Sequence, residues 1–310
     1  MIRGSAAVLA AGLALVLLLV VPPIVGIGAV LLLEPASFGD VAQYGFRGGK
    51  VAGTTLMWAG VTGLCATMVG WLPGRRVANM PSGWLLGFII LPLALPAALL
   101  FDAWWLNVGP DSVIGSWAAR TGQVPLLRQV VLGVGFVCWA WPISSLCVAA
   151  RARSGSCQLL ARIDDLGIFA RFFLALREDR GGLCLGWLLS SACIAGNTVC
   201  FDLAQVSSWG FELRALDARG ASASTVFLAG IPAMGLAISV VVIAGSVLRF
   251  GRPLKLVRYQ FESGRGVIAF VAVLVLVPLC LLILRGLSVL DFGQLRAIHG
   301  SAIVNTLMLG

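Results

Sequence analysis

The sequence predicts an all-α protein, a polytopic bundle of transmembrane helices. Of its 310 residues, 59% are hydrophobic and 11% are charged, and the mean hydropathy is +0.99, values that are typical of membrane proteins. The apolar residues come in runs of about 20, the length that an α-helix needs to cross a hydrocarbon layer of roughly 30 Å. Basic residues gather in alternate loops between these runs. The length of the chain therefore reflects a number of spans rather than of soluble domains.

Seven apolar runs are long enough to cross a membrane, and an eighth begins near Ser301 and stops with the chain. The first run follows Arg3 and is roughly twice as long as the apolar region of a signal peptide, so we expect a retained span rather than a cleaved leader. Residues 1–260 are predicted to form a six-span membrane domain, and residues 261–310 a seventh span and the beginning of a second repeat. The predicted spans are 6–33, 50–72, 83–105, 126–150, 182–204, 223–250 and 266–287.

The distribution of basic residues predicts a cytoplasmic N-terminus. If the spans alternate in direction, Arg3, the pair Arg75 and Arg76, and the basic residues of 151–180 and 249–265 all lie on one side of the membrane. The opposite loops are mixed or poorer in charge. Cytoplasmic loops carry an excess of lysine and arginine, so this side is the cytoplasm. The net charge of +9 follows from this topology, and no nucleic acid is expected as a partner.

Two prolines, Pro92 and Pro96, interrupt the third run. Each proline frees a backbone carbonyl that lipid cannot satisfy, so we expect these carbonyls to face other helices or a cavity. Asp102 ends the same run beside Trp104 and Trp105, which are typical of the headgroup layer. Asp102 is therefore expected at the outer interface, with a place on a translocation path as the alternative.

The fifth run is rich in small and hydroxyl residues and ends in Asn197, Thr198 and Asp202. A helix of this composition is expected to face other helices. An acid near the end of a span costs free energy unless it is hydrated or paired, so Asp202 either lines a translocation path or marks the membrane edge. Asn197 and Thr198 either line the same path or bond a neighbouring helix.

The longest polar segment, residues 151–180, separates the fourth and fifth runs. It carries six arginines and four acids, and its apolar residues recur at helical spacings of three and four. A loop between two spans needs no such stripe unless it packs on something, so the segment predicts a docking surface for a soluble partner. The stripe consists of Leu159, Ile163, Leu166, Ala170 and Phe173.

The sequence carries no set of residues for hydrolytic or redox chemistry. It has one histidine, no Cys-x-x-Cys pair among eight cysteines, and no glycine-rich phosphate loop ending in Lys-Ser or Lys-Thr. We therefore expect a protein that is not an enzyme and that holds no metal and no cofactor. If ATP is used, another chain binds it.

A short internal repeat is indicated near the end of the chain. Residues 38–60 are echoed by residues 292–310, with Thr-Thr-Leu-Met at 54–57 lying over Asn-Thr-Leu-Met at 305–308. Chance is the alternative, because the match is short. A genuine repeat predicts that a second six-span copy begins here and that the encoded chain continues.

Several motifs resemble those of the membrane-spanning permease subunits of bacterial binding-protein-dependent ABC importers. Residues 54–56 resemble the Asn-Thr-Leu-like start of that family's first helix, and residues 70–73, Gly-Trp-Leu-Pro, resemble its Gly-x-Pro end. Residues 91–96 and 109–110 resemble the proline-rich helix that follows and its Gly-Pro end. The resemblance is strongest to the N-terminal half of fused, two-copy permeases of the ferric-iron, thiamine, putrescine and phosphonate type, and by layout it covers most of 36–250.

In this family a cytoplasmic loop with a Glu-Ala-Ala motif and a following glycine forms the coupling helix that docks on the ATPase. When the glycine of this motif is aligned with Gly167, Ala-Arg-Ile stands at the Glu-Ala-Ala positions and Asp179 stands where the family has a leucine. The two acids of this segment either pair with a basic groove on the ATPase or lie on a solvated helix face. By resemblance, the coupling residues are Ala161, Ile163, Asp164, Asp165, Leu166, Gly167, Ala170 and Phe173.

The resemblance implies the permease component of an ABC importer in a bacterial inner (plasma) membrane. The implied partners are ABC ATPase subunits, a periplasmic or lipid-anchored solute-binding protein, a second permease half and membrane lipid. A non-transporting membrane scaffold or assembly protein, which kept the fold while its coupling motif decayed, is the alternative.

Overall fold

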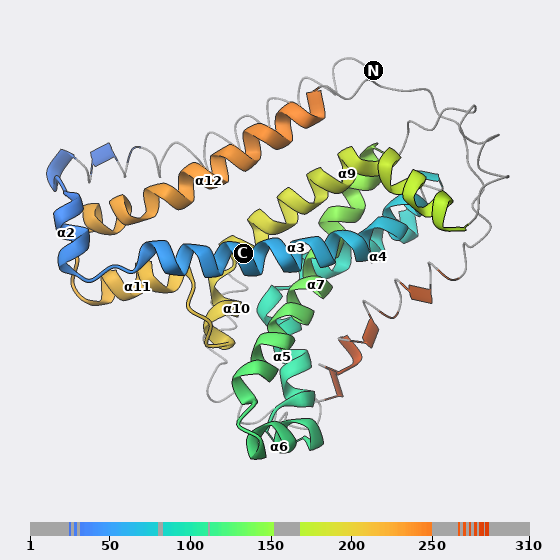
Figure 1. Ribbon diagram of the computed structural model, residues 1–310, viewed down its shortest axis with the longest axis horizontal. Helices are drawn as coiled ribbons and strands as arrows, with labels where there is room; N and C mark the ends of the chain where they lie inside the picture. The colour runs from blue at the N-terminus through green and yellow to red at the C-terminus, as the bar shows by residue number, and fades with distance from the viewer. Residues whose placement is uncertain are drawn as a thin grey trace, which may run out of the picture. The chain divides into compact units, whose positions relative to one another are not determined.

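The computed structural model describes residues 32–79, 83–110, 112–151 and 168–249, with scattered positions at 25–29 and within 266–284. Every regular element in these ranges is an α-helix, which confirms the predicted all-α class (Figure 1). The helices are α2 Phe38–Gln43, α3 Gly48–Asn79, α4 Gly83–Ala94, α5 Ala97–Val108, α6 Val113–Arg120, α7 Val124–Arg151, α9 Ile168–Gly196, α10 Thr198–Leu203, α11 Trp209–Ala218 and α12 Ala223–Arg249.

Three described helices are long and apolar enough to cross a membrane, over Gly48–Ala78, Val124–Arg151 and Ala223–Val240. A fourth span is added if the bent pair α4 and α5 counts as one. These helices show a membrane-embedded protein. The predicted spans 6–33 and 266–287 fall outside the described residues apart from scattered positions, and the predicted eighth span from Ser301 falls outside them entirely.

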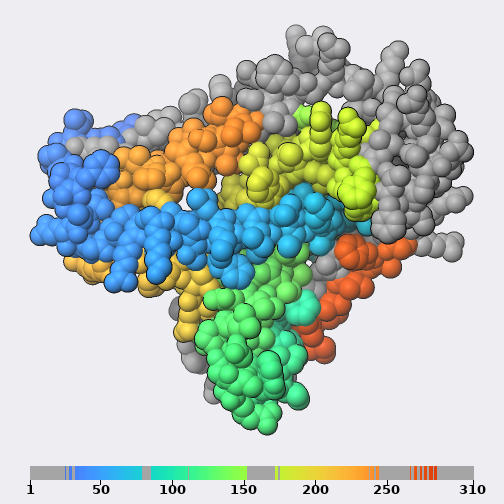
Figure 2. Space-filling model, in the orientation of Figure 1, coloured from blue at the N-terminus to red at the C-terminus, as the bar shows by residue number. Residues whose placement is uncertain are grey.

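The exposed side chains of α3 are those of a helix that faces lipid. Met57, Val61, Leu64, Met68 and Leu72 are each between 46% and 58% exposed, and they recur at spacings of three and four. The helix lies uncovered along the face of the molecule in Figure 2. Small and hydroxyl residues occupy its packed side. In a water-soluble protein the apolar side of a helix is packed and the polar side is exposed, and α3 has the opposite arrangement.

The predicted third span, 83–105, is not one straight helix. α4 and α5 are bent by 83° at the break before Pro96. Because Pro96 has no N–H, the Leu95 N–H bonds the Pro92 carbonyl instead, at 3.3 Å. The Leu95 carbonyl accepts a hydrogen bond from the indole Nε1 of Trp139 on α7, at 3.1 Å. The carbonyl that Pro96 frees, that of Pro92, thus takes a donor within its own segment, whereas the carbonyl that meets another helix is that of Leu95, at the break itself.

We expect Trp139→Phe to destabilise the bend between α4 and α5. The ring is kept, but the Leu95 carbonyl loses its donor in an apolar environment, which costs about 1–3 kcal/mol. Thermal unfolding in detergent measures the effect. Trp187→Phe is the matched control, because Trp187 also donates to a backbone carbonyl, that of Gly60, which lies inside the unbroken helix α3 and has a helical donor of its own. Equal melting of the two variants would contradict the role of Trp139.

The predicted fifth span, 182–204, is also interrupted. α9 ends at Gly196 and α10 begins at Thr198, and between them Asn197 has φ −88° and ψ 75°. The Asn197 N–H bonds the Ile194 carbonyl at 3.0 Å. The run of apolar residues predicted one helix here, and the structure has two.

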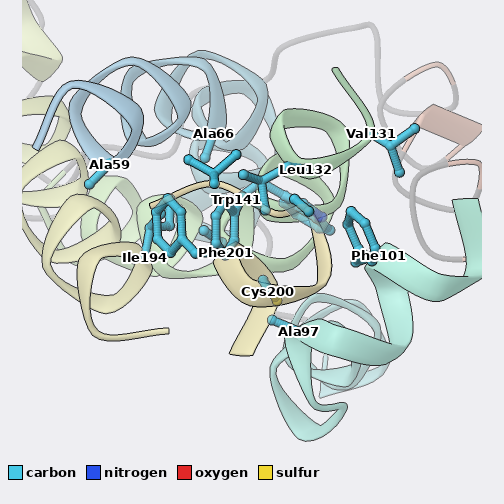
Figure 3. Packing of buried hydrophobic residues seen from close by; sticks show 14 of the residues in the cluster. Ala59, Ala66, Ala97, Phe101, Val131, Leu132, Trp141, Ile194, Cys200 and Phe201 are labelled. Atoms are coloured by element: carbon cyan, nitrogen blue, oxygen red, sulfur yellow. The ribbon is translucent and has the colours of Figure 1, made fainter. Parts of the chain in front are cut away.

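The described chain divides into two compact units, residues 56–206 with 243–310 and residues 1–55 with 207–242. In the first unit, α7 packs against α4, α5, α6 and α9. Its fully buried Trp141 belongs to a core with side chains from α3, α5, α9 and α10 (Figure 3). The predicted division between residues 260 and 261 falls outside the described residues and stays a prediction.

The second unit is built from α2, α11, α12 and the first turns of α3. Its apolar core contains Val41 and Leu216. The Arg219 guanidinium donates to the Tyr44 carbonyl at 2.6 Å. The Trp209 N–H, at the start of α11, donates to the Thr55 hydroxyl at 3.0 Å, so a residue of the Thr-Thr-Leu motif satisfies a helix N-terminus in this unit.

Candidate functional site

Small residues allow the backbones of α3, α7 and α9 to come into direct contact. A Cβ atom added at Gly74 of α3 would lie 2.5 Å from the carbonyl oxygen of Ser145 on α7. One added at Gly186 of α9 would lie 2.9 Å from the Cα of Ser144. Neither position has room for a side chain. Such contacts are typical of helices that associate in lipid, because the hydrophobic effect does not drive association there and close packing of the helices does.

Four hydroxyl side chains, which we call the hydroxyl seam, join these three helices. They are Thr67, Ser144, Ser145 and Ser190, and each is at most 1% exposed. Ser144 Oγ lies 3.0 Å from Thr67 Oγ1 and 2.9 Å from Ser190 Oγ, and Ser145 Oγ donates to the Gly70 carbonyl at 2.7 Å. Every member therefore has a partner, as buried polar groups require. Three members form a chain of hydroxyl groups across the three helices, and Ser145 adds a bond from α7 to the backbone of α3.

Beyond the seam, toward the start of α9, lies a buried carboxylate. Asp179 Oδ2 accepts a hydrogen bond from Trp71 Nε1 at 2.6 Å. The same oxygen forms an ion pair with Arg75 Nε at 3.2 Å. The Asp179 side chain is 6% exposed and that of Arg75 is 25% exposed. The Arg75 guanidinium also lies 5.8 Å from the centre of the Trp71 ring, within the range of a cation–π contact. We call Trp71, Arg75 and Asp179 the Asp179 cluster.

The surroundings of the Asp179 cluster are aromatic and partly acidic. The Phe172 ring meets the Trp71 ring edge to face, with centroids 5.2 Å apart. Partial burial raises the pKa of the neighbouring Glu178 carboxyl, Arg75 lowers it and Asp179 raises it. Arg75 thus faces two carboxyl groups of α9, of which Asp179 is the buried one. The cluster ties the beginning of α9 to the end of α3.

The predicted coupling residues fall mostly outside the described part of the chain. Ala170 lies in the first turn of α9, and the Phe173 side chain is 67% exposed, with its ring 5.9 Å from that of Phe172. The second half of the predicted loop, from Ile168 to Arg180, is the beginning of α9 and continues into the bundle without a break. The residues outside the described ranges are Ala161, Ile163, Asp164, Asp165, Leu166 and Gly167.

The four path candidates lie on two neighbouring segments. Asp102 is on α5, and Asn197, Thr198 and Asp202 lie at the break before α10 or on α10 itself. α10 packs against α5. The structure therefore brings Asp102 next to the helix that carries Asp202. The Asn197 side chain does not cap α10.

Sequence reasoning missed the hydroxyl seam and the burial of Asp179. A signal for the seam is present, because Gly70 and Gly74 on α3 and Gly182 and Gly186 on α9 repeat the spacing of small residues at which helices pack closely. Asp179 stands in an Arg-Glu-Asp-Arg run, which is typical of a solvated face. Its local sequence carries no sign of the tryptophan that covers it.

Among the residues that the structure describes, no three histidine, cysteine or acidic side chains lie close enough together to hold a metal ion. No protein-family model, curated protein or solved structure matches the chain. A proposal for its function therefore depends on the residues and on their geometry.

Proposed function

We propose that the chain is the permease component of an ABC importer, which forms the solute path and couples to a separate ATPase. The observation that carries the proposal is the Asp179 cluster, because it links α9, which begins at the predicted coupling segment, to the membrane-spanning α3. The all-helical apolar bundle and the resemblance of the motifs support it. In this proposal six spans lie within residues 1–260, a seventh span and the start of a second repeat follow, and the N-terminus is cytoplasmic in a bacterial inner membrane.

The proposed mechanism is alternating access. A solute-binding protein delivers ligand to the outer loops, and ATP-driven closure of two ATPase subunits then displaces the coupling segment around Gly167. Because α9 begins at Ile168, directly after that glycine, the displacement moves α9 as a rod. The Asp179 cluster passes the movement to α3. Substrate would pass Asp102, Asn197, Thr198 and Asp202, with a second permease half on the other side of the path.

Recovery of the complex from native membranes tests the proposal. The full chain is purified in mild detergent and the bound chains are identified by mass spectrometry. We expect a chain with a phosphate-binding loop, together with ATP hydrolysis by the purified complex. If no ATPase is recovered, or if ATP hydrolysis is absent, the permease function is wrong.

Phe173 allows a matched test of the coupling surface. Phe173→Asp places a charge on the exposed apolar stripe and should lower ATPase recovery several-fold, since burying an unpaired charge in the contact is costly. Phe173→Leu keeps the stripe apolar and should recover the ATPase as the unmodified chain does. Equal recovery with both variants would remove Phe173 from the coupling surface.

A membrane scaffold or assembly protein is the second candidate, and the missing Glu-Ala-Ala and Leu-Pro residues of the coupling motif favour it. In that case the purified chain carries other membrane subunits at fixed stoichiometry and no ATPase. The same mass-spectrometry measurement therefore separates the two functions.

A further inference from the structure

α6 is a short helix that packs across the end of α5 and α7 (Figure 1). Ser112 caps its first turn by accepting the Gly115 N–H at 2.9 Å. At its other end the Gln123 N–H bonds the Ala118 carbonyl at 2.7 Å, and Gly122 supplies the left-handed residue with φ +70°. Both ends of the helix are therefore defined by local hydrogen bonds.

One side of α6 is packed against the preceding turn. Ala118 is fully buried, and a Cβ atom at Gly115 would collide with the backbone of Gly109 and Pro110. The remaining circumference is exposed and divides into two arcs. Val113, Ile114 and Trp117 are 86%, 52% and 55% exposed and form an apolar arc. Ser116 and Arg120 form the polar arc beside it, and Arg120 Nε donates to the Ser116 carbonyl at 3.3 Å.

The neighbouring helices place α6 at the level where a bilayer ends. α7 has 28 residues, about 42 Å at about 1.5 Å per residue, which exceeds a hydrocarbon layer of roughly 30 Å and brings its ends into the headgroup region. α6 joins α7 through the short turn at 121–123. At the same end, the Arg128 guanidinium of α7 lies 5.2 Å from the centre of the Trp105 ring. Tryptophan and arginine side chains together are typical of the membrane interface.

We propose that α6 is a membrane-surface helix, which lies in the interface of the bilayer with Val113, Ile114 and Trp117 immersed at the boundary of headgroups and acyl chains. The occupant of the apolar arc is the lipid surface. An apolar arc directly beside a basic, polar arc on one exposed surface is what an interfacial helix presents to lipid. This inference does not depend on the proposed function.

Nitroxide accessibility tests the proposal on the full chain in lipid nanodiscs of phosphatidylcholine and phosphatidylglycerol. Single cysteines replace Val113, Ile114, Trp117, Ser116 or Arg120 in a variant without the eight native cysteines. All five positions are at least partly exposed, so the labels are expected to leave the fold intact. Oxygen, which enters lipid, and a water-soluble nickel chelate then compete as relaxation agents.

We expect the ratio of oxygen to nickel accessibility to be several-fold higher at positions 113, 114 and 117 than at 116 and 120. Equal ratios at all five positions would mean that α6 is solvated, and low accessibility to both agents at the apolar arc would mean that another protein covers it. Either result overturns the proposal. Quenching of a fluorophore at position 113, but not at position 120, by acyl-labelled lipids is an independent measurement of the same depth difference, and its absence would also count against lipid contact.

Discussion

Replacing Asp179 by alanine is expected to lower the stability of the bundle by about 2–3 kcal/mol, somewhat less than the 3–5 kcal/mol for breaking a fully buried pair, because Arg75 is 25% exposed. The loss has two sources. Trp71 Nε1 loses its acceptor in a buried site, and the Arg75 guanidinium loses its ion pair. Thermal unfolding of the purified chain in detergent measures the change.

The controls for Asp179 lie on the same helix and in the same cluster. Glu178→Ala removes an exposed carboxylate and should change the stability by no more than about 0.5 kcal/mol. In a double-mutant cycle, Trp71→Phe and Asp179→Ala should be non-additive, because both remove the same hydrogen bond. Additive effects, or an Asp179→Ala variant that melts like the unmodified chain, would show that the cluster does not hold α9 to α3.

Gly74→Ala is expected to have an effect of similar size. Its Cβ would lie 2.5 Å from the Ser145 carbonyl oxygen and 2.9 Å from the Cβ of Val148. Both contacts are with the body of α7, so α3 and α7 must separate. Overpacking of this kind costs about 1–3 kcal/mol, and the separation also lengthens the hydrogen bond from Ser145 to Gly70. Thermal unfolding again measures the change.

Gly60→Ala is the matched control for Gly74, because it lies on the same helix and its Cβ meets no atom within 4 Å. Alanine is the better helix former by about 1 kcal/mol, so this variant should be neutral or more stable. If Gly74→Ala also proved neutral, the close approach of α3 and α7 would not be needed for the fold.

Local composition was sufficient to predict the all-α class and membrane embedding. A long run of hydrophobic residues indicates a helix that is surrounded by lipid, and the exposed apolar stripe of α3 agrees with that interpretation. The two prolines were sufficient to predict an interruption of the third run, but not that the Leu95 carbonyl meets α7 there. These features depend on residues that are neighbours along the chain, which is why periodicity and hydropathy reveal them.

A polar residue within an apolar run is conspicuous, and this signal indicates the path candidates. Asp102 and Asp202 both carry it, and the structure places their helices side by side. The same signal is absent at Asp179, because the three charged residues around it are typical of a solvated face. A carboxylate surrounded by charges in sequence is buried here by residues that are remote in sequence.

The sequence by itself determined the helical class and the membrane environment, and its prolines indicated an interruption of the third run, because each follows from local chemistry. Only the tertiary structure decided where the helices break and which groups meet at the breaks. The Trp139 donor to Leu95 is 44 residues away, and the Trp71 donor to Asp179 is 108 residues away. Buried polar groups must find partners wherever the packing of helices supplies them. The 83° bend between α4 and α5 and the attachment of α9 to α3 are therefore properties of the packed bundle.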